Sequence, residues 1–237
     1  MRRVGVTDPG DAVALARRVA AQSNLEYAGV AFYPGHIRAA AAGQDEALGA
    51  LRDQLSRTLA ALDDAGLAPP VVSAGSTPTL WRTHELPRIT EIRPGSYVYN
   101  DRTIASMGAC SWDDCAMTVL ATVVSTSVKG QAVIDAGSKA LGREPMGSAA
   151  DGFGQLLEHP EVKVVRMSEE HGVIDTSSTS WTPRVGDRVR VIPNHVCVAI
   201  SLFDLAYGIR GDEVALTWRI DARGRGQEPF PGSQTLA

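Results

Sequence analysis

The stretch Pro-Pro-Val-Val-Ser-Ala-Gly-Ser-Thr-Pro-Thr, residues 69–79, holds a short apolar run followed at once by a glycine turn and a helix-start signal. An apolar run of strand length is typical of a strand buried on both faces of a parallel sheet. In such sheets the binding loops follow the carboxyl ends of the strands. Backbone N–H groups in such a loop can cradle a phosphate, with added hydrogen bonds from Ser76 and Thr77; a capped helix start without a ligand is the alternative.

The segments around this stretch alternate between helices and strands. Periodic apolar residues predict helices over 8–23 and 43–65, and apolar runs predict strands over 27–33 and 90–93. This alternation predicts βα units and a parallel sheet. Tyr33 closes the first strand, where it could contact a cofactor or substrate, or could instead lie in a partly exposed loop.

A second loop of the same kind, Pro94-Gly95-Ser96-Tyr97, follows the next predicted strand. Gly95 would let the backbone approach a ligand closely. In eight-stranded (β/α) barrels, phosphate sites often use the loops after the last two strands. The two loops, with Ser76 and Thr77 in one and Gly95 and Ser96 in the other, fit that layout better together than either does alone, and a capped helix start without a ligand stays the alternative.

The pattern changes after about residue 115, where β-branched and alternating segments are separated by Gly, Pro and Asp turns. These segments are 117–128, 131–135, 162–167, 172–175, 187–192, 196–200 and 213–220. They predict a mainly antiparallel β domain over residues 115–237, after an α/β domain over residues 1–114. The tail from Gly224 onward is predicted to be frayed.

His195-Val196-Cys197 is the clearest candidate metal site. If these residues lie on a strand, as the segment predicts, His195 and Cys197 point to the same face. Imidazole and thiolate are both good zinc ligands, and two ligands leave positions open for water or substrate. The alternative is a buried cysteine beside a hydrogen-bonded histidine.

Composition excludes several classes of protein. The 237 residues carry a net charge of -4 and show no basic stripe, so no nucleic-acid partner is expected. No apolar run approaches the roughly 18 residues of a membrane span. The three cysteines lack CxxC spacing and no signal peptide is recognisable, which favours a reducing compartment and a cytoplasmic location. Among the few lysines, Lys139 is interpreted as a structural ion-pair partner.

Five motifs resemble those of one family when they are taken in order: residues 73–79, 91–101, 133–139, 168–172 and 186–197. The first two are similar to the phosphate-binding strands of fold-type III pyridoxal phosphate (PLP) enzymes. All five together resemble the D-serine dehydratase and D-threonine aldolase family, which shares its barrel with alanine racemase. The resemblance implies the last part of an alanine racemase-like (β/α)8 barrel followed by a mainly antiparallel β domain.

The same resemblance implies a PLP- and zinc-dependent dehydratase of a D-β-hydroxy amino acid such as D-serine or D-3-hydroxyaspartate. It assigns the phosphate to Thr77, Ser76, Gly95 and Ser96, and the metal to His195 and Cys197 as catalytic ligands. A His-x-Cys pair is similar to that of the dehydratases, whereas the aldolases tend to have His-x-Asp. Family members pair, so a homodimer is expected for the intact enzyme.

The chain departs from the family at its start. Residues 1–6 resemble the end of the family's fifth barrel strand, which places Arg3 at a cofactor-side arginine and Tyr33 near the cofactor. The Schiff-base lysine of the first strand has no counterpart among the three lysines. The chain is therefore expected to be the C-terminal part of such an enzyme, from a misplaced start or a truncated gene.

Two alternative functions stay open. One is a metal-dependent D-threonine-type aldolase on the same scaffold, which would split the substrate into glycine and an aldehyde. The other is a non-catalytic remnant, because a barrel lacking most of its strands would expose sheet edges and apolar faces.

Overall fold

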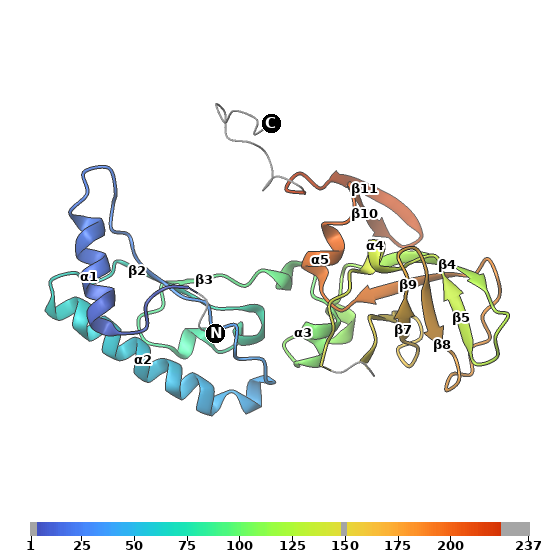
Figure 1. Cartoon of the computed structure of the whole chain (residues 1–237), viewed down its shortest axis with the longest axis horizontal. Coiled ribbons are helices and arrows are strands. Elements are labelled where there is room, and N and C mark those ends of the chain that lie inside the picture. The colour runs from blue at the N-terminus through green and yellow to red at the C-terminus, as the bar shows by residue number, and fades with distance from the viewer. Residues whose placement is uncertain (1–3, 148–150, 224–237) are drawn as a thin grey trace, which may run out of the picture. The chain divides into compact units, whose positions relative to one another are not determined.

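A computed structural model describes residues 4–147 and 151–223 and contains two compact units. The first unit comprises Met1–Val98 and Ile104–Asp114, and the second comprises Tyr99–Thr103 and Cys115–Ala237 (Figure 1). The short segment 99–103 thus belongs to the second unit although it lies between parts of the first in the sequence. Within the described residues, no helix has both the length and the apolarity needed to cross a membrane.

A three-stranded parallel sheet forms the centre of the first unit, in the order β1-β2-β3. Its strands are β1 (Gly29–Ala31), β2 (Val71–Ala74) and β3 (Glu91–Ile92), and its helices are α1 (Pro9–Ala20) and α2 (Asp45–Asp64). Short 3-10 turns are η1 (Ala41–Gly43), η2 (Thr77–Thr79), η3 (Thr83–Glu85), η4 (Ser96–Val98) and η5 (Trp112–Asp114). The predicted alternation of strands and helices is therefore present, with shorter strands than the sequence suggested.

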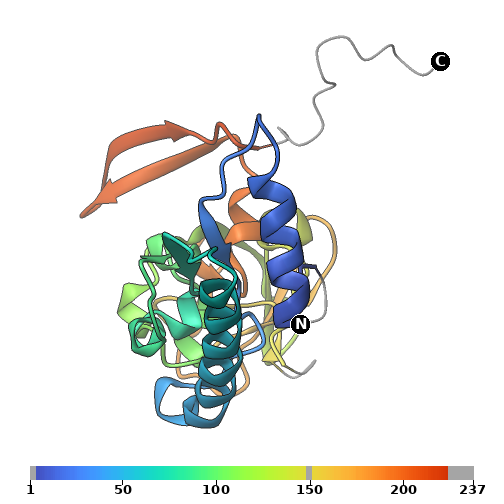
Figure 2. The same ribbon diagram turned by 90° about the vertical axis from the view of Figure 1, so that its left-hand side faces the viewer.

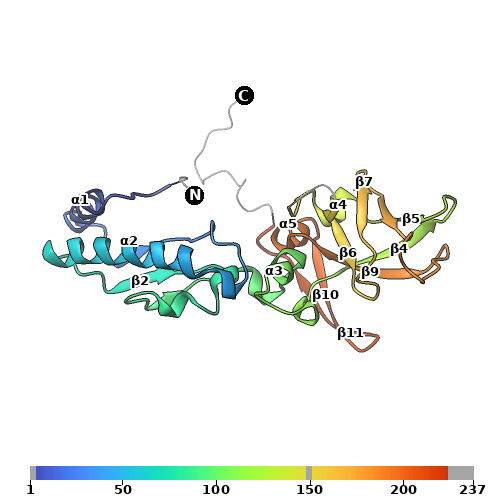
Figure 3. The ribbon, with the colours of Figure 1, turned by 90° about the horizontal axis from the view of Figure 1, so that it is seen from below.

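Helix α2 covers one face of this sheet, and α1 packs beside α2 (Figures 2 and 3). Leu48, Leu55 and Leu59 recur at helical spacing and pack with Val72 in one buried cluster. Burial of each such leucine contributes about 2 kcal/mol. The helix ends where Gly66 adopts φ +71, which completes a Schellman cap.

Six antiparallel strands form a nearly closed barrel in the second unit, in the order β6-β9-β4-β5-β8-β7. The strands are β4 (Val119–Ser125), β5 (Gln131–Ile134), β6 (Gly154–Leu156), β7 (Val164–Met167), β8 (Gly172–Asp175) and β9 (Arg188–Pro193). The Phe153 N–H donates to the Val164 carbonyl at 2.8 Å, which brings β6 back to β7. Val119, Ala121 and Val123 of β4 point inward at alternate positions, as the sequence alternation predicts.

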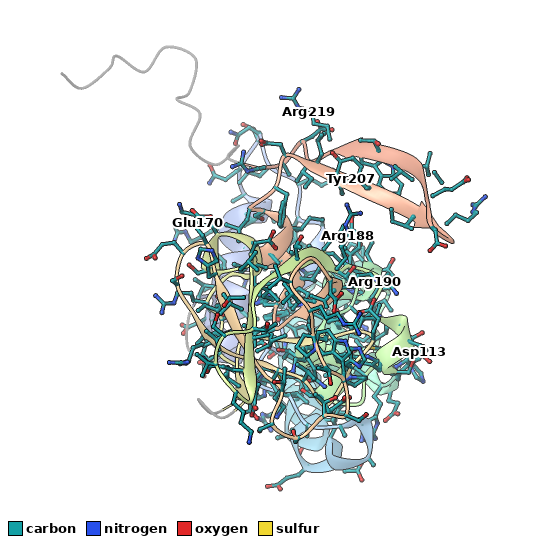
Figure 4. All side chains as sticks on the ribbon, turned by 90° about the vertical axis from the view of Figure 1, so that its right-hand side faces the viewer. Asp113, Glu170, Arg188, Arg190, Tyr207 and Arg219 are labelled. Atoms are coloured by element: carbon teal, nitrogen blue, oxygen red, sulfur yellow. The ribbon has the colours of Figure 1, made fainter. Side chains whose placement is uncertain are left out.

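Two short helices and a hairpin complete the second unit: α4 (Ser138–Leu141), α5 (Val196–Ile200), β10 (Leu205–Arg210) and β11 (Glu213–Arg219). The short helix α3 (Arg102–Ser106) begins in the second unit and ends in the first. Tyr207 and Arg219 lie on the β10–β11 hairpin, whose strands are largely exposed (Figure 4). Strands β6 and β10 were not predicted. The predicted frayed tail from Gly224 lies outside the described residues.

The strand predicted over 196–200 is wrong, because these residues form helix α5. Their β-branched composition favours a strand. Two hydrogen bonds decide otherwise: the Asp101 carboxylate accepts from the Val196 N–H at 3.0 Å, and the Ala199 N–H donates to the His195 carbonyl at 3.2 Å. The capped first turn therefore overrides the local preference.

Candidate functional site

The loop after β2 is built around Ser76 and Thr79. The Ser76 and Thr79 hydroxyls lie 3.1 Å apart, and the Ser76 N–H donates to Thr79 Oγ1 at 3.3 Å, which forms a capping box for η2. Both side chains are buried. The Ser76 hydroxyl therefore serves the turn itself, which favours the capping interpretation for this residue.

Thr77 lies in the same turn and differs from its neighbours. Its side chain is 4 % exposed, and its Oγ1 is buried without a hydrogen-bond partner in the described part of the chain. A buried hydroxyl without a partner costs about 1–3 kcal/mol. A phosphate oxygen at this turn would satisfy the hydroxyl, so Thr77 fits the phosphate of PLP.

The loop after β3 lies against the loop after β2. The Arg93 N–H donates to the Ala74 carbonyl at 2.7 Å, and an added Cβ on Gly75 (φ +100) would lie 3.6 Å from the Arg93 nitrogen. An added Cβ on Gly95 would meet nothing within 4 Å, which leaves open space beside that backbone. Ser96 begins η4 directly after it. The two predicted phosphate loops are thus neighbours in the fold.

Two further cofactor residues, Tyr33 and Arg3, were predicted outside these loops. Tyr33 follows β1 and is 53 % exposed. It therefore stands at the same carboxyl edge of the parallel sheet as the two loops. Arg3 lies outside the described residues.

A polar cluster on the same strands was not predicted from the sequence. Arg93 Nε donates to Ser73 Oγ at 2.7 Å, Arg93 Nη2 donates to the Phe32 carbonyl at 3.1 Å, and Ser73 also contacts the Glu91 carboxylate. Ser73 and Glu91 are register partners on β2 and β3. The signal was the placement of polar residues at alternate positions of otherwise apolar strands. The cluster leaves the guanidinium half exposed at the strand ends.

Thr77→Val is expected to stabilise the ligand-free chain and weaken its binding of phosphate-bearing ligands. Valine matches threonine in shape but removes the unpartnered hydroxyl, so the melting temperature should rise by an amount equivalent to about 1 kcal/mol. Inorganic phosphate and PLP should then raise the melting temperature less than in the parent. Thermal unfolding with and without each ligand measures both effects. Thr58→Val, at a half-buried position of α2, is the control. Equal phosphate responses in Thr77→Val and the parent would contradict the assignment.

His195 and Cys197 are brought together by the start of α5. His195 is the N-cap residue, with extended backbone angles of φ -140 and ψ 107, and Cys197 is the second residue of the helix. The pKa of His195 is raised, mainly by a hydrogen bond with the Cys197 side chain and further by the charges of Cys197, Asp101 and Glu144, against the effect of burial. The two side chains therefore meet without the strand geometry that the sequence suggested.

The chemistry of this pair suits zinc. His195 is half-buried and Cys197 is exposed, so the thiol can be reached from solvent. Imidazole and thiolate are typical zinc donors. Within residues 4–147 and 151–223 no group of three or more His, Cys, Asp and Glu side chains could hold a metal. The pair would therefore supply two ligands and leave the other positions to water or substrate.

Lys139 does not have the properties of a catalytic amine. Its Nζ lies 2.5 Å from Glu170 Oε1, and this hydrogen bond raises the pKa of Lys139. A nucleophilic lysine requires the opposite shift. The predicted structural ion pair is thus confirmed.

Two families match the chain. Residues 1–103 match "Alanine racemase, N-terminal domain", and residues 116–209 match "Putative serine dehydratase domain". Together these segments include both phosphate loops and the His195–Cys197 pair.

Several curated proteins are similar to the chain. D-threo-3-hydroxyaspartate dehydratase of Delftia sp. is 34% identical over 67% of this chain and 46% of its own length. 3-Hydroxy-D-aspartate aldolase of Paracoccus denitrificans is 29% identical over 94% of this chain and 58% of its own length. An uncharacterized protein of Mycobacterium tuberculosis is 38% identical over half of this chain and 92% of its own length. The chain thus spans about half the length of the two enzymes.

Solved structures confirm the expected fold class. D-threonine aldolase from Filomicrobium marinum matches with a TM-score of 0.81 and 31% identity, over 94% of this chain and 61% of its own. The Delftia dehydratase matches with a TM-score of 0.79 and 30% identity, over 92% and 62%. Two variants of that dehydratase replace a histidine and, two positions later, a cysteine, and the cysteine variant is in a metal-free form. This spacing is that of His195 and Cys197.

Proposed function

Because the chain belongs to the D-serine dehydratase and D-threonine aldolase family of alanine racemase-like, PLP-dependent enzymes, we propose that it provides the metal site and the phosphate loops of a dehydratase. The proposed substrate is a D-β-hydroxy amino acid such as D-serine or D-3-hydroxyaspartate, and the proposed metal is zinc. The observation that carries the proposal is the contact between His195 and Cys197 at the start of α5.

Different residues of the chain would bind PLP and zinc. When bound, PLP supplies an electron sink and zinc supplies a Lewis acid for the β-hydroxyl that leaves. His195 and Cys197 would hold the metal. Thr77 would donate its hydroxyl to the phosphate, and the open backbone at Gly95 would admit it.

Further residues would complete the cofactor site. Ser76 would keep the phosphate loop in shape, and Ser96 would close the phosphate site from the neighbouring loop. Tyr33, at the carboxyl end of β1, would contact the cofactor, and Arg3 is proposed as a cofactor-side arginine. Residues 1–114 contain no lysine, so the reaction requires an amine that they do not supply.

An aldolase is the second candidate, because two aldolases are similar to 94% of the chain. The aldolase would break the Cα–Cβ bond and release glycine and an aldehyde. The dehydratase would eliminate the β-hydroxyl and release a keto acid and ammonia. The cysteine at position 197 favours the dehydratase, because the family's aldolases tend to carry aspartate at the corresponding position.

We expect product analysis of the PLP-treated, zinc-supplemented protein to decide between them, with a small primary amine such as methylamine added to supply the amine that residues 1–114 lack. D-3-hydroxyaspartate should give oxaloacetate and ammonia, and D-serine should give pyruvate and ammonia. Glycine with an aldehyde would instead establish the aldolase. Absence of both product sets from a chain that binds zinc and PLP would establish the non-catalytic remnant. His195→Ala should lose whichever product set the parent gives, whereas His171→Ala, in an exposed turn, should keep it.

We also propose a homodimer in the cytoplasm. The three cysteines, Cys110, Cys115 and Cys197, are not joined in disulfides in the described part of the chain, which is consistent with a reducing compartment. Light scattering of the purified protein measures the oligomeric state directly.

A further inference from the structure

Three consecutive residues from a distant part of the sequence hold the backbone on both sides of His195. Thr103 Oγ1 donates to the Asn194 carbonyl at 2.6 Å, immediately before His195. Asp101 Oδ2 accepts from the Val196 N–H at 3.0 Å, immediately after it. All of these residues belong to the second unit. The metal-ligand turn is therefore fixed at two points by segment 101–103.

The middle residue of that segment, Arg102, holds Asn194 by its side chain. Arg102 Nη1 donates to Asn194 Oδ1 at 3.0 Å, and Arg102 Nε donates to Gln155 Oε1 at 2.6 Å. Asn194 Nδ2 donates to the carbonyls of Glu144 at 2.9 Å and Gly152 at 2.8 Å. The amide of Asn194 thus uses both its oxygen and its nitrogen, which fixes its orientation.

Burial of the Arg102 guanidinium costs free energy that an apolar side chain at this position would not. Arg102 is 5 % exposed, and burial lowers the pKa of its guanidinium. The oxygens that accept its hydrogen bonds, from Asn194, Gln155 and the Asp151 carbonyl, are uncharged, and the charge of Asp151 only partly offsets the effect of burial on the pKa. Burying a charge costs free energy, and buried polar networks are often replaceable as a whole by apolar side chains with little loss of stability. The guanidinium presents several N–H donors in one rigid plane, and these donors fix the directions of the Asn194 and Gln155 side chains.

We propose that Asp101 and Arg102 are positioning residues that set the backbone of residues 194–196 so that His195 and Cys197 converge on one metal ion. This inference rests on the proposed metal site, and it identifies the residues that hold the ligands of that site in place. Residues that orient metal ligands commonly change metal affinity by about 10–100-fold when they are replaced. Neither side chain has to touch the metal.

Cobalt(II) is a suitable probe, because a thiolate ligand gives it a charge-transfer absorption band. In the full chain, we expect Arg102→Met and Asp101→Ala each to weaken cobalt binding about tenfold or more and to reduce the band at saturating metal. Asp101→Asn keeps an oxygen acceptor for the Val196 N–H and should bind cobalt like the parent. Val123→Ala removes buried methyl groups from the barrel core and should lower stability while it leaves the band unchanged.

Amide hydrogen exchange of the metal-free protein gives a second readout. The amides of Val196 and Ala199 should exchange faster in Arg102→Met and Asp101→Ala, but not in Val123→Ala, because only the first two release the turn. Arg102→Lys provides a milder variant if Arg102→Met does not fold.

The outcomes separate this inference from the proposed function. Cobalt binding by Arg102→Met and Asp101→Ala equal to that of the parent would overturn the inference alone. So would a loss of affinity in Val123→Ala as large as theirs, since that would trace the effect to stability. Absence of the thiolate band from the parent would overturn the proposed metal site and the inference with it.

Discussion

Cys197→Ala is expected to lower the zinc affinity of the chain by about 100-fold or more, because it removes one of only two proposed protein ligands. The thiolate is also the stronger donor of the pair for this metal. Competition with a chromophoric chelator measures the affinity directly. The same variant should lose the zinc-induced rise in melting temperature, because a ligand that binds only the folded state stabilises it in proportion to its affinity.

Cys110→Ala is the matched control, because Cys110 is also a cysteine outside any disulfide but belongs to the first unit. It should retain the zinc affinity of the parent. Cys197→Asp should keep a ligand at the position and recover part of the affinity, with a smaller preference for soft metals. Equal zinc affinity in Cys197→Ala and the parent would show that the contact between His195 and Cys197 has no role in metal binding.

The regular parts of the fold could be predicted because each follows one local rule. The leucines of α2 recur at helical spacing, and the inward residues of β4 recur at every second position. The short strand β6 could not be predicted, because three residues are too few to show a period. Helix α5 was predicted as a strand because its start depends on Asp101, which is far away in the sequence.

The candidate site likewise has parts that could be predicted from the sequence and parts that could not. The sequence predicts the loop after β2 from its glycine and hydroxyl residues, but it treats Ser76 and Thr77 as equivalent. The structure separates them, since Ser76 bonds within its turn and the Thr77 hydroxyl has no partner in the described residues. Arg102 and Asn194 were missed because neither stands in a pattern that sequence periodicity can reveal. Their significance depends on contacts across 92 positions of the chain.

The motif over residues 133–139 contacts the motif over residues 168–172, which the sequence alone does not show. The Ser138 N–H donates to the Ser168 carbonyl at 2.9 Å, and the Lys139 N–H donates to the Glu169 carbonyl at 3.1 Å. Gly137 lies between the two motifs, where an added Cβ would be 2.5 Å from the Glu169 carbonyl oxygen and 2.6 Å from the His171 nitrogen. The motifs over residues 133–139 and 168–172 are therefore packed against each other through their backbones.

Gly137→Ala is expected to destabilise the second unit by about 3 kcal/mol, which corresponds to a fall in melting temperature of roughly 10 °C. The backbone of Gly137, with φ -104, is accessible to alanine, so the cost is steric and arises from backbone atoms that cannot rotate away. Thermal and denaturant unfolding measure the loss.

Gly49→Ala is a control that should raise stability rather than lower it. Gly49 lies inside α2, where an added Cβ meets nothing within 4 Å, so this change should stabilise the helix by about 0.5–1 kcal/mol. A Gly137→Ala protein as stable as the parent would mean that residues 135–139 and 168–171 are not in contact. A destabilised one should also bind zinc less well, since α4 leads to Gly142, whose added Cβ would lie 2.7 Å from Val198 of the helix that carries Cys197.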